Sequence, residues 1–160
     1  MTPETTQQTN TLQLHRHIRA PPERVYRAFL DPDALVKWQA PHGFVAKVHH
    51  HDAKVGGTYK MSFRNFGTGT EHSFGGKFVE LTEFSRIRWT DAFEDQENLP
   101  GQMMVTLDLE PSSIGTFVTI TQEGLPAAMP IEFATSGWQE SLNLLAQLIE
   151  PNIPDGPIEG

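Results

Sequence analysis

Near its C-terminus the chain has a long stretch with the 3.6-residue period of an amphipathic helix. Apolar residues recur three or four positions apart, and polar residues fill the opposite arc. The apolar positions are Ile131, Ala134, Trp138, Leu142, Leu145 and Ile149. This spacing predicts a helix of roughly five turns over about 131–150, which Pro151 keeps from continuing. Because an apolar stripe must be covered, the rest of the chain has to supply one apolar face.

The middle of the chain has the two-residue period of β-strands. Turn sequences rich in Gly, Pro, Asn and Ser separate most of the strands. We predict strands at about 44–51, 57–66, 72–82, 85–94, 102–110 and 115–123. Since a parallel pair needs a crossover of a dozen or more residues, such short connections predict antiparallel pairing.

A further strand and two short helices precede this region. Leu12, Leu14 and Ile18 share one parity, which indicates a half-buried strand. One short helix follows Pro21-Pro22, and a second begins at Asp31-Pro32. The predicted fold class is therefore α+β, with a seven-stranded antiparallel sheet curled around the long C-terminal helix. We expect one domain over 12–150, with tails at 1–11 and 151–160.

Composition excludes several classes of function. Lys plus Arg is 12 and Asp plus Glu is 20, and a formal net charge of −8 argues against nucleic acid or an anionic membrane surface as the main partner. The absence of cysteine removes disulfides, thiolate metal sites and cysteine nucleophiles. No apolar run is long enough to cross a bilayer, and the N-terminus lacks the features of a secretory signal. We expect a cytoplasmic protein.

Four stretches, in this order and spacing, resemble the START-like or SRPBCC superfamily, which has the helix-grip fold of the birch-pollen allergen. The nearest resemblance is to the family of the C-terminal domain of the activator of heat-shock protein 90 ATPase. The stretches are residues 16–26 (RHIRAPPERVY), Asp31-Pro32 before Trp38, residues 55–59 (VGGTY), and residues 115–119 (GTFVT) followed by Gly137-Trp138. The resemblance implies a cavity between the long helix and the sheet. It does not choose among lipid carriers, hormone receptors, polyketide aromatase/cyclases and co-chaperone domains.

Strand parity and the helix stripe together predict which side chains line that cavity. Phe78 is the least secure of them, because Val79 and Leu81 have the other parity. A bulge at Gly75-Gly76 would resolve the conflict. Small residues on the helix leave room for a pocket of roughly 300–1,000 Å³, and the alternative is a solid core. The expected ligand-binding residues are Tyr59, Met61, Phe63, Phe74, Phe78, Trp89, Phe93, Met103, Ala134, Gly137, Trp138 and Ser141.

Polar residues with inward parity need a partner, water or a ligand. These are Arg16, His50, His72, Asp91 and Gln122. Convergence of His72 and Asp91 would give the best acid–base candidate, because a carboxylate can orient a histidine that titrates near neutral pH.

The run of three histidines at 49–51 invites a metal interpretation. On a regular strand His49 and His51 share one face and His50 takes the other. Two histidines supply at most half of a tetrahedral zinc site, so we expect no physiological metal and no cofactor.

The leading hypothesis is non-catalytic binding of a small hydrophobic or aromatic molecule by a monomer or homodimer. A co-chaperone-like protein-interaction domain is the alternative. An aromatase/cyclase-type enzyme is a third interpretation, which depends on His72 and Asp91.

Overall fold

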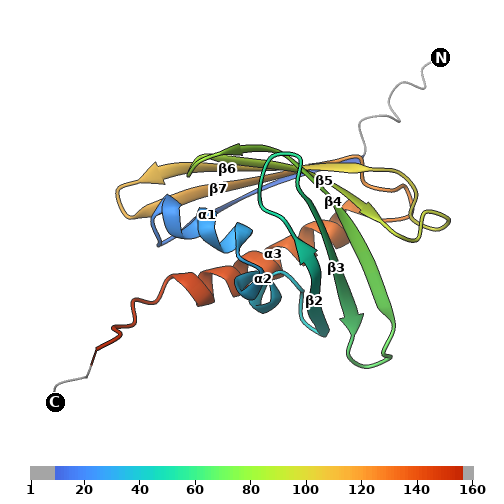
Figure 1. Cartoon of the computed structure of the whole chain (residues 1–160), viewed down its shortest axis with the longest axis horizontal. Helices are drawn as coiled ribbons and strands as arrows, with labels where there is room; N and C mark the ends of the chain where they lie inside the picture. Colours follow the sequence, from blue (N-terminus) through green and yellow to red (C-terminus); the bar gives the residue numbers. More distant parts are fainter. Residues whose placement is uncertain (1–9, 157–160) are drawn as a thin grey trace.

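One sheet of seven antiparallel strands forms the framework of a computed structural model that describes residues 10–156 (Figure 1). The strands lie in the order β1-β7-β6-β5-β4-β3-β2, so every neighbouring pair except β1 and β7 is consecutive in the chain. Their bounds are β1 Thr11–Ile18, β2 Phe44–His51, β3 Thr58–Asn65, β4 Glu71–Thr82, β5 Arg86–Phe93, β6 Met103–Ser112 and β7 Gly115–Glu123.

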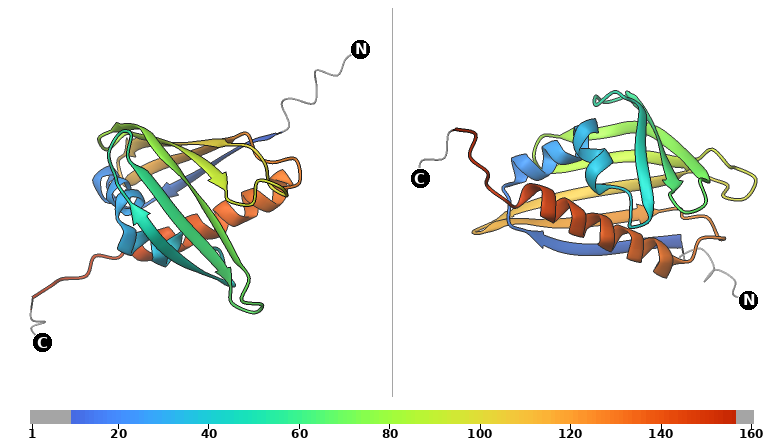
Figure 2. Two further views of the ribbon diagram at one scale, coloured as in Figure 1. Left: turned by 45° about the vertical axis from the view of Figure 1, so that its right-hand side comes forward. Right: turned by 90° about the horizontal axis from the view of Figure 1, so that it is seen from below.

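Three helices lie on one side of this sheet: α1 (Pro22–Leu30), α2 (Pro32–Trp38) and α3 (Ile131–Ile149). Figure 2 shows α3 running along the concave side of the curled sheet, with α1 and α2 beside it. This arrangement confirms the predicted helix-grip fold, including the two short helices after the first strand. None of the described helices is long and apolar enough to cross a membrane.

The two short helices are fixed by local sequence chemistry. The Asp31 side chain accepts a hydrogen bond from the Asp33 amide, which caps α2, and Pro32 occupies the first turn. Trp38 ends α2 fully buried, and its indole Nε1 donates to the Ala28 carbonyl at 3.1 Å. The α1–α2 pair therefore has its own apolar contact with the core.

The two halves of α3 are packed differently. From Ser141 onward its inward residues are buried, and Arg24 of α1 donates to the Ile149 carbonyl at 2.8 Å, which satisfies an end of the helix. In the first turns Ala134 and Trp138 are only half-buried, and Trp138 Nε1 donates to Gln122 Oε1 on β7 at 2.8 Å. The C-terminal half of α3 is thus anchored in the core, whereas the N-terminal half rests on fewer contacts.

Two β-bulges change the parity that a regular strand would have. In β2 the register shifts between Val48 and His50, so that His49 and His50 both face outward, where they contact Ser62 and Thr58. His51 then turns inward against Tyr59. The predictions that His50 faces inward and that His49 and His51 share a face are therefore wrong, because the extra residue reverses the alternation.

The second bulge lies in β4, between Phe78 and Glu80. It resolves the parity conflict around Phe78, but at Val79 instead of the predicted Gly75-Gly76. These two glycines have another role. A Cβ on Gly75 would collide with the Tyr59 carbonyl, and one on Gly76 with the Thr90 carbonyl. Only residues without a side chain permit β3, β4 and β5 to approach so closely there.

The domain begins slightly earlier than predicted. Thr11 already belongs to β1, and the Asn10 carbonyl accepts hydrogen bonds from the amides of Gly124 and Leu125. The rest of the expected N-terminal tail, residues 1–9, lies outside the described residues, as do residues 157–160. Residues 151–156 are exposed and carry no helix or strand.

Candidate functional site

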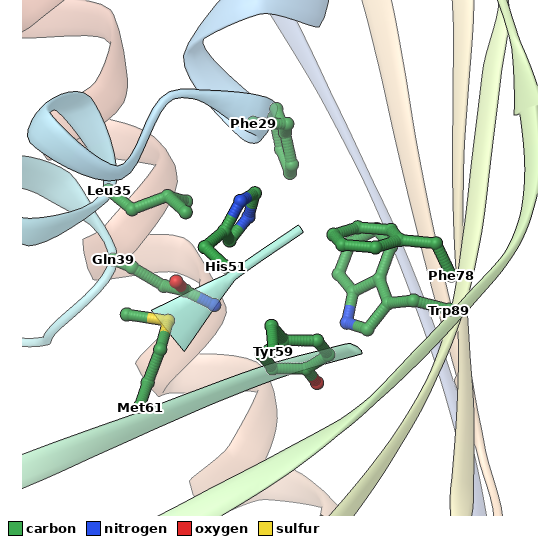
Figure 3. Close-up of a pocket in the computed structure, with 8 residues that line it drawn as sticks. All are labelled: Phe29, Leu35, Gln39, His51, Tyr59, Met61, Phe78 and Trp89. Carbon is green, nitrogen blue, oxygen red and sulfur yellow. The ribbon is translucent and has the colours of Figure 1, made fainter. Parts of the chain in front are cut away.

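A partly open pocket lies between the α1–α2 pair and the concave face of strands β2 to β5 (Figure 3). Its volume is about 20 Å³, which is room for about one water molecule. The predicted volume of a drug-sized ligand is therefore wrong for this structure. The lining residues are Phe29, Leu35, Gln39, His51, Tyr59, Met61, Phe78 and Trp89.

Aromatic rings form much of the wall. The His51 and Phe78 rings meet edge to face with centroids 5.3 Å apart, and Tyr59 and Phe78 are 5.7 Å apart. Phe29 of α1 lies 6.3 Å from Trp89 of β5, across the space between helix and sheet. Such tilted contacts are favourable for aromatic pairs, and they fill most of the space.

Gln39 supplies a polar side chain to the pocket wall. Its backbone is fully engaged: the amide donates to the Leu35 carbonyl at 3.0 Å, and the carbonyl accepts from Ser141 Oγ at 2.6 Å. Its side-chain Oε1 is buried and has no hydrogen-bond partner among residues 10–156. An unpaired buried acceptor costs roughly 1–3 kcal/mol, so this oxygen favours a bound water or a ligand that carries a donor.

Tyr59 and Asp91 form a second polar feature beside the pocket. The Tyr59 hydroxyl donates to Asp91 Oδ1 at 3.0 Å and also lies 3.1 Å from the Thr90 carbonyl. Burial raises the pKa of Asp91 to about 7, against the opposing effect of hydrogen bonds from Tyr59 and the Ala92 amide. Burial and the nearby carboxylate also raise the pKa of Tyr59 well above its usual value.

His51 is the only histidine among the eight described residues that line the pocket. Burial lowers the pKa of its ring, and the negative charges of Asp31 and Asp52 oppose that effect only in part. At neutral pH the wall therefore presents an uncharged imidazole, and the site as a whole is suited to a molecule that is mostly apolar.

The residues predicted to line the cavity fall into three groups. Tyr59, Met61, Phe78 and Trp89 do line the pocket. Phe74, Met103 and Ser141 are buried elsewhere, and Ser141 holds α2 to α3. The remaining five are half-buried and lie outside this pocket: Phe63, Phe93, Ala134, Gly137 and Trp138.

Four lining residues were missed by sequence reasoning. Phe29 and Leu35 lie on the apolar stripes of the short helices, so the sequence pattern indicates that they are buried. It does not indicate that these helices cover the pocket. His51 became inward only through the β2 bulge. Nothing in the sequence singles out Gln39.

The candidate acid–base pair does not converge. Phe74 lies opposite Phe93 and Gly75 opposite Ala92, so His72 is about four residues, roughly 13 Å, along the strand from the level of Asp91. His72 is exposed. The other inward polar residues have structural partners, since Gln122 pairs with Trp138 and Arg16 donates to Asn143 at 2.9 Å.

The weak metal candidates are also separated, because His49 and His51 lie on opposite faces of β2. Among residues 10–156 no group of three or more His, Cys, Asp or Glu side chains is placed to hold a metal ion.

Comparison with known proteins agrees with this fold. A crystal structure of a protein from Chromobacterium violaceum is 56% identical, with a TM-score of 0.88 over 89% of this chain and 99% of that chain. The solution structure of an AHSA1-like protein from Aeromonas hydrophila is 20% identical, with a TM-score of 0.72 over 88% and 92% of the two chains. A Mycobacterium smegmatis protein is 19% identical, with a TM-score of 0.75 over 92% and 95%. A search of curated proteins gave no match.

The sequence comparison agrees with the structural one. Residues 19–150 match the family described as Activator of Hsp90 ATPase homolog 1-like protein, and this span runs from the end of β1 to the end of α3. The chain therefore belongs to the Activator of Hsp90 ATPase homolog 1-like family.

Proposed function

We propose that this domain binds a small hydrophobic or aromatic molecule, without covalent chemistry, between the α1–α2 pair and strands β2 to β5. The observation that carries the proposal is the unpaired Gln39 Oε1 in a pocket whose other walls are mostly aromatic. Pockets for small molecules are typically apolar with a few placed polar groups. The ligand would carry a hydroxyl or amine that donates to Gln39.

A molecule of this kind needs more than 20 Å³, so binding requires α2 to move outward. This helix has only seven residues. Two hydrogen bonds join its C-terminal end to α3, from Ser141 Oγ to the Gln39 carbonyl and from the His42 amide to Glu140 Oε1 at 2.9 Å. The strands behind the pocket are joined by ladder hydrogen bonds that are interrupted at the two bulges, and we expect α2 to be the wall that yields.

Tryptophan fluorescence tests the proposal, because Trp89 lies in the wall. Titration with a flavonoid, a fatty acid and an apolar dye should give a saturable change with at least one of them. Gln39→Leu should weaken binding of the hydroxyl-bearing flavonoid by about tenfold, while leaving the dye unaffected. Gln147→Leu, an exposed change on α3, is the matched control. Absence of saturation with all three probes, and of any co-purified mass by native mass spectrometry, would contradict the proposal.

The small pocket volume favours a second candidate, a co-chaperone-like protein-interaction domain that acts through its surface. Exposed apolar side chains are available for such contacts, among them Ile114 in the β6–β7 turn and Phe117 on β7. Failure of ligand binding together with an intact fold would favour this candidate. The aromatase/cyclase interpretation has lost its acid–base pair, since His72 and Asp91 are apart.

A further inference from the structure

The face of the sheet that is turned away from α3 carries a hollow of about 330 Å³ over β2 and β3. Its lining residues are Val45, Ala46, Lys47, Ser62, Arg64 and Glu71. Strand register explains the hollow. Lys47 lies opposite Ser62, which lies opposite Ser73, while the longer Arg64 and Glu71 form the next cross-strand pair. The small Ser62 therefore forms a floor between longer side chains.

Hydroxyl groups at this floor are held in a fixed network. Ser62 is 1% exposed, and its Oγ lies 2.6 Å from His49 Nε2 and 2.8 Å from Ser73 Oγ. Glu71 Oε2 approaches the same His49 nitrogen at 4.0 Å. Because serine and carboxylate share one ring nitrogen, the group lacks the relay geometry of a nucleophilic triad.

Two cations beside the hollow have no carboxylate partner. Within residues 10–156, no ion pair within 4.0 Å involves Lys47 or Arg64; of the 12 Lys and Arg, three are paired in this way, Lys54, Lys60 and Arg86. The Arg64 guanidinium lies 5.9 Å from the centre of the Phe66 ring. Lys47 and Arg64 therefore place two positive charges beside the hollow in a chain whose net charge is −8.

We propose that this hollow binds a small molecule through a carboxylate or phosphate group, with Lys47 and Arg64 as its cationic ligands. The two residues are diagonal neighbours on adjacent strands, a spacing of roughly 7–8 Å that lets two long side chains close on one oxyanion. Arginine offers a fork of donors and lysine a point charge, and both suit these groups. Glu71 on the opposite wall repels a second anionic group, so the rest of the ligand is neutral or cationic.

The test uses the full chain with inorganic phosphate and acetate as separate probes, and sodium chloride at matched ionic strength as the reference. Each titration is followed by ¹⁵N–¹H NMR spectra and by the melting temperature. We expect saturable shifts of the Lys47, Ser62 and Arg64 amides with at least one probe. The double change Lys47→Ala with Arg64→Ala should weaken this binding about tenfold or more.

The control removes the same charge elsewhere: Arg27→Ala with Lys37→Ala, on α1 and α2. It should keep the affinity of the natural chain. Saturation by phosphate alone or by acetate alone identifies the group that is bound. Equal weakening in both double variants, or no response beyond that to chloride, would overturn the proposal, because the effect would then be general charge screening.

Discussion

The protonation of Asp91 links one residue to the stability of the protein. The pKa of Asp91 is about 7 in the folded state, against about 3.9 for an unperturbed aspartate. Between these values the native state holds a proton that the unfolded state has released. The free energy of unfolding therefore falls as pH rises from about 4 to 7. Above pH 7 it no longer depends on the ionisation of Asp91.

Asp91→Asn should remove that dependence, because asparagine cannot ionise yet still accepts from Tyr59. The two pKa values differ by about three units, so we expect the variant to gain up to about 4 kcal/mol over the natural chain at pH 8 and to gain little at pH 4. Urea unfolding at pH 4, 6 and 8 measures this, with the exposed Glu110→Gln as control. An unchanged pH profile in Asp91→Asn would show that another group is responsible.

Two glycines should respond oppositely to the same substitution. A Cβ at Gly137 meets no atom within 4 Å, so Gly137→Ala should stabilise α3 by about 0.5–1 kcal/mol through lower unfolded-state entropy. Gly76→Ala forces a Cβ against the Thr90 carbonyl and should cost about 1–3 kcal/mol. Thermal unfolding of both variants checks this, and destabilisation by Gly137→Ala would show closer packing of α3 than described.

Among the helices, α2 depends on α3 through Ser141. Ser141→Ala leaves the Gln39 carbonyl without its 2.6 Å hydrogen bond and should cost about 1–3 kcal/mol. Hydrogen exchange should become faster in α2 than in the sheet, because only that connection is lost. Uniform acceleration over all elements would mean that α2 does not open separately.

The two tryptophans of α2 and α3 should differ in their contribution to stability. Trp38 is fully buried, and Trp38→Ala should cost about 3–5 kcal/mol. Trp138, on the apolar stripe of α3, is half-buried, so Trp138→Ala should cost less, and the loss should come chiefly from the hydrogen bond to Gln122. Equal losses on urea unfolding would show that the N-terminal half of α3 is packed as tightly as the C-terminal half.

For the molecule as a whole, the C-terminal segment should contribute little. Arg24 contacts this segment through Asn152 Oδ1 at 3.1 Å, while Ile153 is 81% exposed. A chain ending at 152 should be as stable as the full chain, and one ending at 150 should lose about 0.5–1.5 kcal/mol. Calorimetry of the two truncated chains separates these cases. A large loss in the longer one, or a change of oligomeric state, would show that the segment docks.

Periodicity and short turns determined the order of elements and the antiparallel pairing of successive strands, whereas the pairing of β1 with β7 joins the two ends of the sheet sequence and was not predicted. The 3.6-residue stripe of α3, the alternation in the strands and the short turns are local features, and each constrains its neighbours directly. The inward positions of Tyr59, Met61 and Trp89 followed from the same alternation, because no bulge intervenes along their strands. One apolar stripe facing one apolar sheet side then left few arrangements.

Tertiary structure alone decided the bulges, the covering of the pocket and its size. A bulge forms where pairing with another strand favours an extra residue, and this depends on partners far away in the chain; His51 turned inward for that reason. Gln39 lies in the pocket wall, where its backbone carbonyl accepts a hydrogen bond from Ser141, 102 residues further along the chain. The pocket volume could not be predicted from the sequence pattern. A cavity is the small difference between the space that the elements enclose and the total volume of the side chains that fill it, and this difference depends on close packing in three dimensions.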